Sequence, residues 1–136
     1  HKGCQSVLLV HDLDKNKSVA LRAQLELMLS SASMEHKFVV IPNEELEAWL
    51  LCDPAALKKA MNLTKLPRKL HHPETIVAPK EHMQTIVRAH SKEQSKQYVN
   101  TIHNKLIANE IDVTVISSSC PSFSHFQAFV AAAIGR

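Results

Sequence analysis

Two short apolar runs, joined by one stretch of helical pattern, constrain the fold more than any other feature of this sequence. Residues 6–10 read Ser-Val-Leu-Leu-Val, and residues 38–41 read Phe-Val-Val-Ile. Neither run alternates between apolar and polar residues, so both are predicted to be strands buried on both faces. Between them, apolar residues recur at helical spacing over 19–29, after Ser18 as the predicted N-cap. This order predicts a βαβ unit with parallel strands and a right-handed crossover.

The remainder of the chain is predicted to be mainly helical. Asn43 precedes a predicted helix over 44–51, and Asp53-Pro54 is typical of the cap and first residue of a helix that ends near residue 61. Residues 111–116 fit either a strand or a helical turn. Further helices are predicted from Pro79, over 94–109 and over 122–134, with a loop over 66–75. No repeat or linker interrupts the pattern, so residues 1–136 are predicted to form a single domain.

The glycine content restricts how this chain can bind phosphate. The sequence contains two glycines, Gly3 and Gly135, and both lie at the chain ends. The P-loop and the dinucleotide-binding fingerprint both need interior glycines, so both are excluded. Any phosphate group would therefore be bound through a metal ion or through basic side chains.

The net charge and the cysteine spacing show no sign of a dedicated nucleic-acid binder or of a disulfide-rich secreted protein. The net charge of +3 permits contact with nucleic acid but does not indicate it. Cys4, Cys52 and Cys120 lack Cys-x-x-Cys spacing, which argues against a structural zinc site and against a disulfide framework. No signal peptide and no apolar run of membrane length is visible. We therefore expect a cytoplasmic protein with reduced thiols.

Two aspartates follow the first predicted strand. Asp12 and Asp14 lie in the polar loop after Val10, and ligands of open parallel sheets bind outside the carboxyl ends of the strands. Two carboxylates two residues apart can face one hard cation such as Mg²⁺, which prefers oxygen ligands. The alternative is that both are ordinary turn or cap residues. The sequence leaves both readings open.

A second acidic group follows the second predicted strand. Glu44, Glu45 and Glu47 come directly after it, and neighbouring strand ends would bring them towards Asp12 and Asp14. In a helix that starts here, Glu44 and Glu47 share a face. The alternative is that they only complement the helix dipole. Taken together, the two groups predict a metal site formed by Asp12, Asp14, Glu44 and Glu47.

These residues also carry a resemblance to a known fold. An apolar strand ending in Asp12-x-Asp14 is followed by Glu45-x-Glu47-Ala-Trp-Leu-Leu and by Asp53-Pro54. Two later segments add to the pattern, Ala78-Pro79-Lys80-Glu81 and Cys120-Pro121-Ser122-Phe123. The pattern resembles the TOPRIM fold, and more closely a small TOPRIM-like family of unknown function. That family is related to the nuclease domains of the OLD (overcoming lysogenization defect) type, and the resemblance runs from about residue 7 to residue 129.

The resemblance implies a three-layer α/β domain with a small, mainly parallel sheet flanked by helices. It also implies a Mg²⁺- or Mn²⁺-dependent nuclease that cleaves phosphodiester bonds of nucleic acid, with DNA favoured over RNA. Such domains often belong to phage-defence systems and act beside an ATPase partner protein. In such domains the Asp-x-Asp, here Asp12 and Asp14, binds the metal. A glutamate after the next strand, here Glu47 or Glu44, completes the acidic site.

Two lysines and one departure complete the comparison with that family. Lys15 and Lys80 are candidates to contact the phosphate, and Lys80 joins Asp12, Asp14 and Glu47 as a predicted catalytic residue. The alternative is that both are solvated surface lysines.

The family's first strand ends in a glutamate that acts as a general acid/base or metal ligand. No such segment precedes Ser6, so either that strand is missing here or this copy lacks the catalytic group.

Two other functions stay open at this level. One is a non-catalytic TOPRIM-like module that binds nucleic acid or an ATPase partner. The other is a phosphoacceptor receiver domain, which ranks last because no third aspartate follows the strand over 38–41. A cluster of basic residues could contact a nucleic-acid backbone or form a solvated loop. It consists of Lys58, Lys59, Lys65, Arg68, Lys69, His71 and His72.

Overall fold

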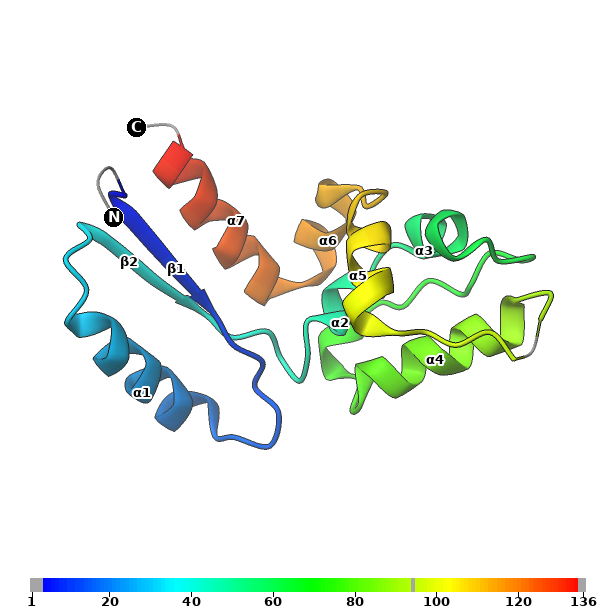
Figure 1. Ribbon diagram of the computed structural model, residues 1–136, viewed down its shortest axis with the longest axis horizontal. Helices are drawn as coiled ribbons and strands as arrows, with labels where there is room; N and C mark the ends of the chain where they lie inside the picture. The colour runs from blue at the N-terminus through cyan, green and yellow to red at the C-terminus, as the bar shows by residue number, and fades with distance from the viewer. Residues whose placement is uncertain (1–3, 94, 135–136) are drawn as a thin grey trace.

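The computed structural model describes residues 4–93 and 95–134 (Figure 1). Its N-terminal part is the predicted βαβ unit, formed by β1 (Ser6–Val10), α1 (Ser18–Ser30) and β2 (His36–Val40). The strands pair in parallel, with Ser6 opposite His36 and Val10 opposite Val40. These are the only two strands in the described residues. The predicted α/β domain with a small parallel sheet is confirmed.

Helices cover both faces of this sheet, because successive side chains of a strand point to opposite faces. On one face, Leu21 and Leu25 of α1 pack with Val39 of β2. On the other face, the ring of Phe38 stacks on Phe129 of α7 (Pro121–Ile134), with ring centroids 4.6 Å apart. Figure 1 shows the resulting order of layers, with the sheet between α1 and α7.

The remaining helices form a second lobe beside the sheet (Figure 1). They are α2 (Glu47–Leu50), α3 (Pro54–Met61), the 3-10 helix η1 (Pro73–Thr75), α4 (Pro79–His90), α5 (Asn100–Ala108) and α6 (Val113–Ser119). Their core includes the fully buried side chains of Leu57, Met83 and Ile107. The short helix α2 joins the two lobes, since Trp49 packs in the sheet core while Leu50 packs in the helical core. No described helix has the length and apolar character needed to span a bilayer.

Several predicted boundaries are wrong, each for a local reason. The first strand is not buried on both faces: residues 6–9 are half-buried and Val10 is 42% exposed, because one helix on each side does not cover the edges of two strands. In β2 the prediction is correct for Val39 and Val40, which point to opposite faces and are both buried. Lys17, not Ser18, is the N-cap of α1. The helix predicted over 44–51 is only α2, capped by Leu46 rather than Asn43, since Glu44 has a left-handed backbone with φ 62°.

The C-terminal half follows the predictions more closely. Asp53 caps α3, and Pro54 and Pro79 are the first residues of α3 and α4, as predicted. The open choice over 111–116 is resolved as a helix, α6. The helix predicted over 94–109 is α5, which begins only at Asn100; residue 94 lies outside the described residues. The last helix, α7, agrees with the prediction over 122–134.

Candidate functional site

The loops after the two strands run side by side. Beyond the last strand residues, Leu13 N donates to the carbonyl oxygen of Pro42 at 3.2 Å. Asp14 N donates to the carbonyl oxygen of Glu44 at 3.1 Å. The pairing of β1 with β2 therefore continues into the loops. It brings the two acidic segments together at the carboxyl ends of the strands, as the sequence predicted.

Asp12 lies at the inner side of this edge and is half-buried. Its Oδ1 accepts a hydrogen bond of 3.0 Å from Leu46 N at the start of α2. Burial raises the pKa of the Asp12 carboxyl, and the carboxylates of Glu47 and Asp14 raise it further, while the Leu46 N–H opposes the shift. Asp12 therefore positions α2 through this hydrogen bond, and the negative charges of its acidic neighbours make its ionised form less favourable.

Glu45 ties this edge to the helical lobe. Its Oε2 accepts a hydrogen bond of 3.0 Å from Lys80 N in the first turn of α4. Burial raises the pKa of the Glu45 carboxyl, and the hydrogen bond from the Lys80 N–H lowers it in part. The negative charges of Glu47, Glu81 and Asp12 raise it further. The backbone of Lys80 is thus the part that the structure joins to the acidic edge, while its side chain is exposed.

Glu47, in the first turn of α2, is the most deeply placed of these carboxylates, at 4% exposed. One oxygen, Oε1, accepts hydrogen bonds from Tyr98 Oη at 3.0 Å and from Asn104 Nδ2 at 3.1 Å. The same Tyr98 hydroxyl also lies against Asn104 Oδ1, a second acceptor for its single proton. Two neutral donors therefore fix this carboxylate from the helical side, since a buried charge needs hydrogen bonds to offset its lost hydration.

Asp14 and Glu44 lie farther out and line a surface pocket of about 500 Å³. Asp14, Glu44 and a third lining residue, Ala78, all have left-handed backbones, with φ of 49°, 62° and 57°. Each such non-glycine residue costs on the order of 1–3 kcal/mol, and strain of this kind clusters at functional sites. The pocket is also lined by Lys15, Asn16, Glu45, Val77 and Glu81.

The four predicted metal ligands thus occupy one edge at two depths. Asp12 and Glu47 lie at the inner side, and Asp14 and Glu44 line the outer pocket. Within residues 4–93 and 95–134, no three His, Cys, Asp or Glu side chains are arranged closely enough to hold a metal ion. The donor set itself is purely carboxylate, and the charges of Glu47 and Asp14 help to raise the pKa of Asp12. This chemistry fits a hard cation, which would relieve that repulsion.

Residues 6–131, from β1 through most of α7, match the sequence profile of a family described as a domain of unknown function, DUF4276. The chain belongs to the DUF4276 family. No curated protein and no solved structure matches it.

Sequence reasoning missed the partners of the buried carboxylates in this DUF4276 domain. Tyr98 and Asn104 lie 51 and 57 residues from Glu47, so no local pattern indicates their contact. A second buried carboxylate, Glu74, accepts hydrogen bonds from Trp49 Nε1 at 3.3 Å and from Ser122 Oγ. This contact unites the Trp-containing segment after β2 with the Pro-Ser-Phe segment that opens α7.

The basic cluster of the DUF4276 domain lies on α3 and in the loop that follows. Its lysines and Arg68 are exposed, and Lys59 Nζ forms an ion pair of 2.6 Å with Glu110. His71 and His72 line a separate surface pocket of about 450 Å³ beside α6 and α7. Trp49 and Phe123 are buried in edge-to-face contact, so they belong to the core, as predicted, and not to a base-stacking surface.

Proposed function

We propose that this DUF4276 domain is a metal-dependent nuclease domain that cleaves phosphodiester bonds of nucleic acid. The observation that carries the proposal is the concentration of carboxylates at the ends of β1 and β2, where burial and neighbouring carboxylates raise the pKa of Asp12 and of Glu45. The three ion pairs formed by the described residues involve none of these carboxylates. A cluster of uncompensated negative charge beside a pocket is suited to a divalent cation.

Asp12, Asp14, Glu44 and Glu47 would hold Mg²⁺ or Mn²⁺, after side-chain rotation at the outer pair. When bound, such a metal neutralises phosphate charge and lowers the pKa of a bound water. The residues of the chain divide the remaining tasks. Glu47 is fixed through Oε1 by Tyr98 and Asn104, which leaves Oε2 for the metal. Lys15, on the rim of the outer pocket, is placed to meet a phosphate oxygen.

The resemblance to TOPRIM-like nuclease domains of the OLD type supports the same reading. It carries the finer expectations: DNA as the substrate, a place in phage defence, an ATPase partner protein and a cytoplasmic location. The exposed basic cluster on and after α3 supports contact with a nucleic-acid backbone, since lysines and arginines gain affinity there by releasing counterions.

The direct test is the nicking of supercoiled plasmid with Mg²⁺ or Mn²⁺, for the wild type and for Asp12→Asn and Asp14→Asn. Asparagine keeps the shape of aspartate, and at position 12 it keeps an oxygen for the Leu46 N–H. We expect both variants to lose roughly 100-fold or more of the nicking rate, because a metal ligand contributes several kcal/mol. Glu26→Gln, an exposed change on α1, is the matched control and should act like the wild type. Equal nicking by all four proteins would refute the proposal.

One observation favours a second function, a module that binds nucleic acid or an ATPase partner without cutting. It is that no metal-binding group of three side chains is preformed among the described residues. A mobility shift of DNA that survives EDTA and both aspartate substitutions, with no nicking, would support this function. Combined Lys65→Glu and Lys69→Glu substitutions in the exposed loop should then abolish the shift.

A further inference from the structure

Two cysteines far apart in the sequence meet inside the protein. Cys52 follows α2 and Cys120 lies between α6 and α7, and both side chains are fully buried. Their Sγ atoms are 2.7 Å apart, across 68 residues of sequence. Nothing in the proposed nuclease function uses them, and their spacing in the sequence did not predict the contact.

The surroundings hold both sulfur atoms in place. The two cysteines belong to one apolar cluster with Val40, Trp49 and Phe123. The Cys52 thiol faces the Ala48 carbonyl oxygen at 3.7 Å, and Cys120 N donates to Ile116 O at 2.8 Å at the end of α6. Packed interiors leave little freedom, so the two sulfur atoms meet in essentially every folded molecule.

We propose that Cys52 and Cys120 are a site of disulfide formation, closed by a small two-electron oxidant such as hydrogen peroxide. One thiol, as its thiolate, attacks a peroxide oxygen and becomes a sulfenic acid, releasing water after proton uptake. The second sulfur then attacks that sulfenic sulfur, and its oxygen leaves as a second water. The two sulfurs together lose two electrons and two protons, and the peroxide becomes two waters.

The environment also explains why the pair rests as thiols. The contact with Cys52 raises the pKa of the Cys120 thiol, and burial raises it further. Since the thiolate is the reactive form, oxidation is slow at neutral pH and quickens as the pH rises. The bond needs the sulfur atoms to approach by only about 0.7 Å, given a normal S–S length of about 2.05 Å.

Closing this bond would have one clear physical consequence. It would link the end of α2 to the junction of α6 and α7, and so close a loop around the whole segment that carries α3, η1, α4, α5 and α6. A cross-link across so long a segment removes conformational freedom mainly from the unfolded chain. Oxidation should therefore raise the melting temperature by roughly 5–15 °C.

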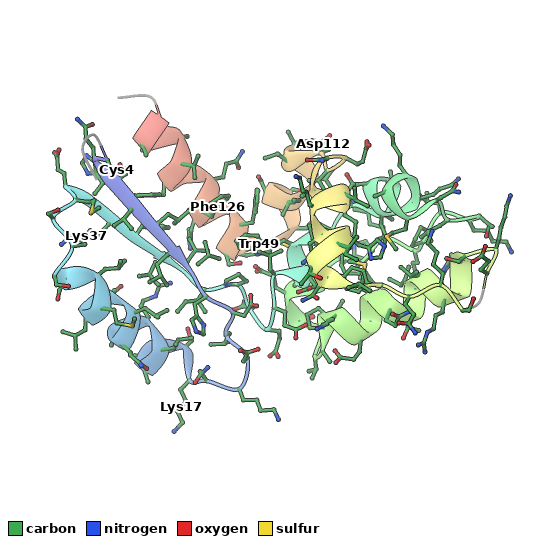
Figure 2. All side chains as sticks on the ribbon, viewed as in Figure 1. Cys4, Lys17, Lys37, Trp49, Asp112 and Phe126 are labelled. Atoms are coloured by element: carbon green, nitrogen blue, oxygen red, sulfur yellow. The ribbon has the colours of Figure 1, made fainter. Side chains whose placement is uncertain are left out.

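The test uses the full chain with Cys4→Ser, because Cys4 is exposed near the start of β1 and could form bonds between molecules (Figure 2). The folded protein is treated with hydrogen peroxide at pH 8.5, quenched, denatured in acid and alkylated with N-ethylmaleimide. We expect an intact mass lower by about 2 Da with no alkylation, and two alkylated cysteines after reduction. The oxidised sample should melt higher, and dithiothreitol should reverse both changes.

Cys52→Ala and Cys120→Ala, each in the same background, are the matched controls. In each, the remaining cysteine should stay alkylatable or gain oxygen, with no reversible rise in melting temperature. The proposal is overturned if the parent protein keeps two alkylatable thiols after prolonged peroxide treatment. It is also overturned if Cys52 or Cys120 accumulates oxygen adducts instead of forming the disulfide bond. These outcomes need neither alanine variant to fold, and they do not depend on nuclease activity.

Discussion

Tyr98 is the single tyrosine of the chain, which makes one residue of the site directly observable. Its hydroxyl donates to Glu47 Oε1 at 3.0 Å. Burial raises the pKa of this phenol well above its ordinary value of 10, and the negative charge of Glu47 raises it further. We expect no phenolate absorbance from the native protein at pH 10, and an ordinary titration around that pH in urea.

The sign of the linked stability follows from that direction. The native pKa exceeds the unfolded one, so this phenol favours the native state fully below about pH 10, and the benefit is lost as the pH rises through the native pKa. Glu47→Gln removes the charge and should move the native titration back towards pH 10. Identical midpoints in native and unfolded protein would contradict the contact.

At the scale of single elements, the Asp53 side chain accepts hydrogen bonds from the starts of two helices, α3 and α6. Its Oδ1 accepts hydrogen bonds from Ala55 N and Ala56 N, both at 3.0 Å, at the start of α3. Its Oδ2 accepts one from Asp112 N, also at 3.0 Å, where α6 begins. Asp53 is 7% exposed, so these donors have no ready replacement in water.

We therefore expect Asp53→Ala to lower the free energy of unfolding by about 2–4 kcal/mol, the sum of a lost cap and of buried donors without partners. Asp112→Ala is the matched control. Asp112 caps only α6 through Thr114 N and is exposed, so its loss should cost clearly less. Urea unfolding, followed by circular dichroism, measures both. Equal losses would contradict the double role of Asp53.

The same residues show how far sequence reasoning reaches. The Asp53-Pro54 signature predicted α3 because a cap acts on neighbouring residues, and the βαβ unit followed from apolar runs that only a sheet can bury. The predicted start of α5 is wrong because Tyr98 lies outside the helix, where contacts with distant residues hold it. Its hydroxyl bonds Glu47 and its backbone N–H bonds Gln84 Oε1 at 2.8 Å. Such long-range contacts leave no periodic trace in the sequence.

The candidate site divides in the same way. Parallel strand ends must lie side by side, so the meeting of Asp12 with the glutamates was predictable from the order of the elements. The hydrogen bond from Lys80 N to Glu45 was not, since it depends on how α4 docks against the sheet edge. The contact between Cys52 and Cys120 depends on docking too, because it joins α2 to the start of α7.

For the whole molecule, the acidic edge makes stability depend on pH in an uncommon direction. Asp12 and Glu45 both have pKa values above their ordinary ones, with burial as the main cause. Such groups favour the native state while protonated. Their contribution is complete below the unfolded values near 3.8 and 4.5, and is lost as the pH rises through the native pKa values.

Asp12→Asn should therefore be more stable than the wild type at pH 7, and this advantage should shrink as the pH falls below 4. Paired urea titrations at the two pH values measure the difference. Asp112 has a lowered pKa from the Thr114 hydrogen bonds, so Asp112→Asn is the opposite control and should lose stability at pH 7. If the Asp12→Asn protein were less stable than the wild type at neutral pH, burial and the neighbouring carboxylates would not be destabilising the Asp12 carboxylate in the native state.

The short helix α2 has a consequence for any attempt to dissect this chain. Its four residues supply side chains to both apolar cores, Trp49 to one and Leu50 to the other, and Figure 2 shows Trp49 where the lobes meet. A cut near α2 would leave each fragment with a large exposed apolar surface, and the fragments would then tend to aggregate rather than to fold. Limited proteolysis of the native protein should accordingly spare this stretch and trim elsewhere first.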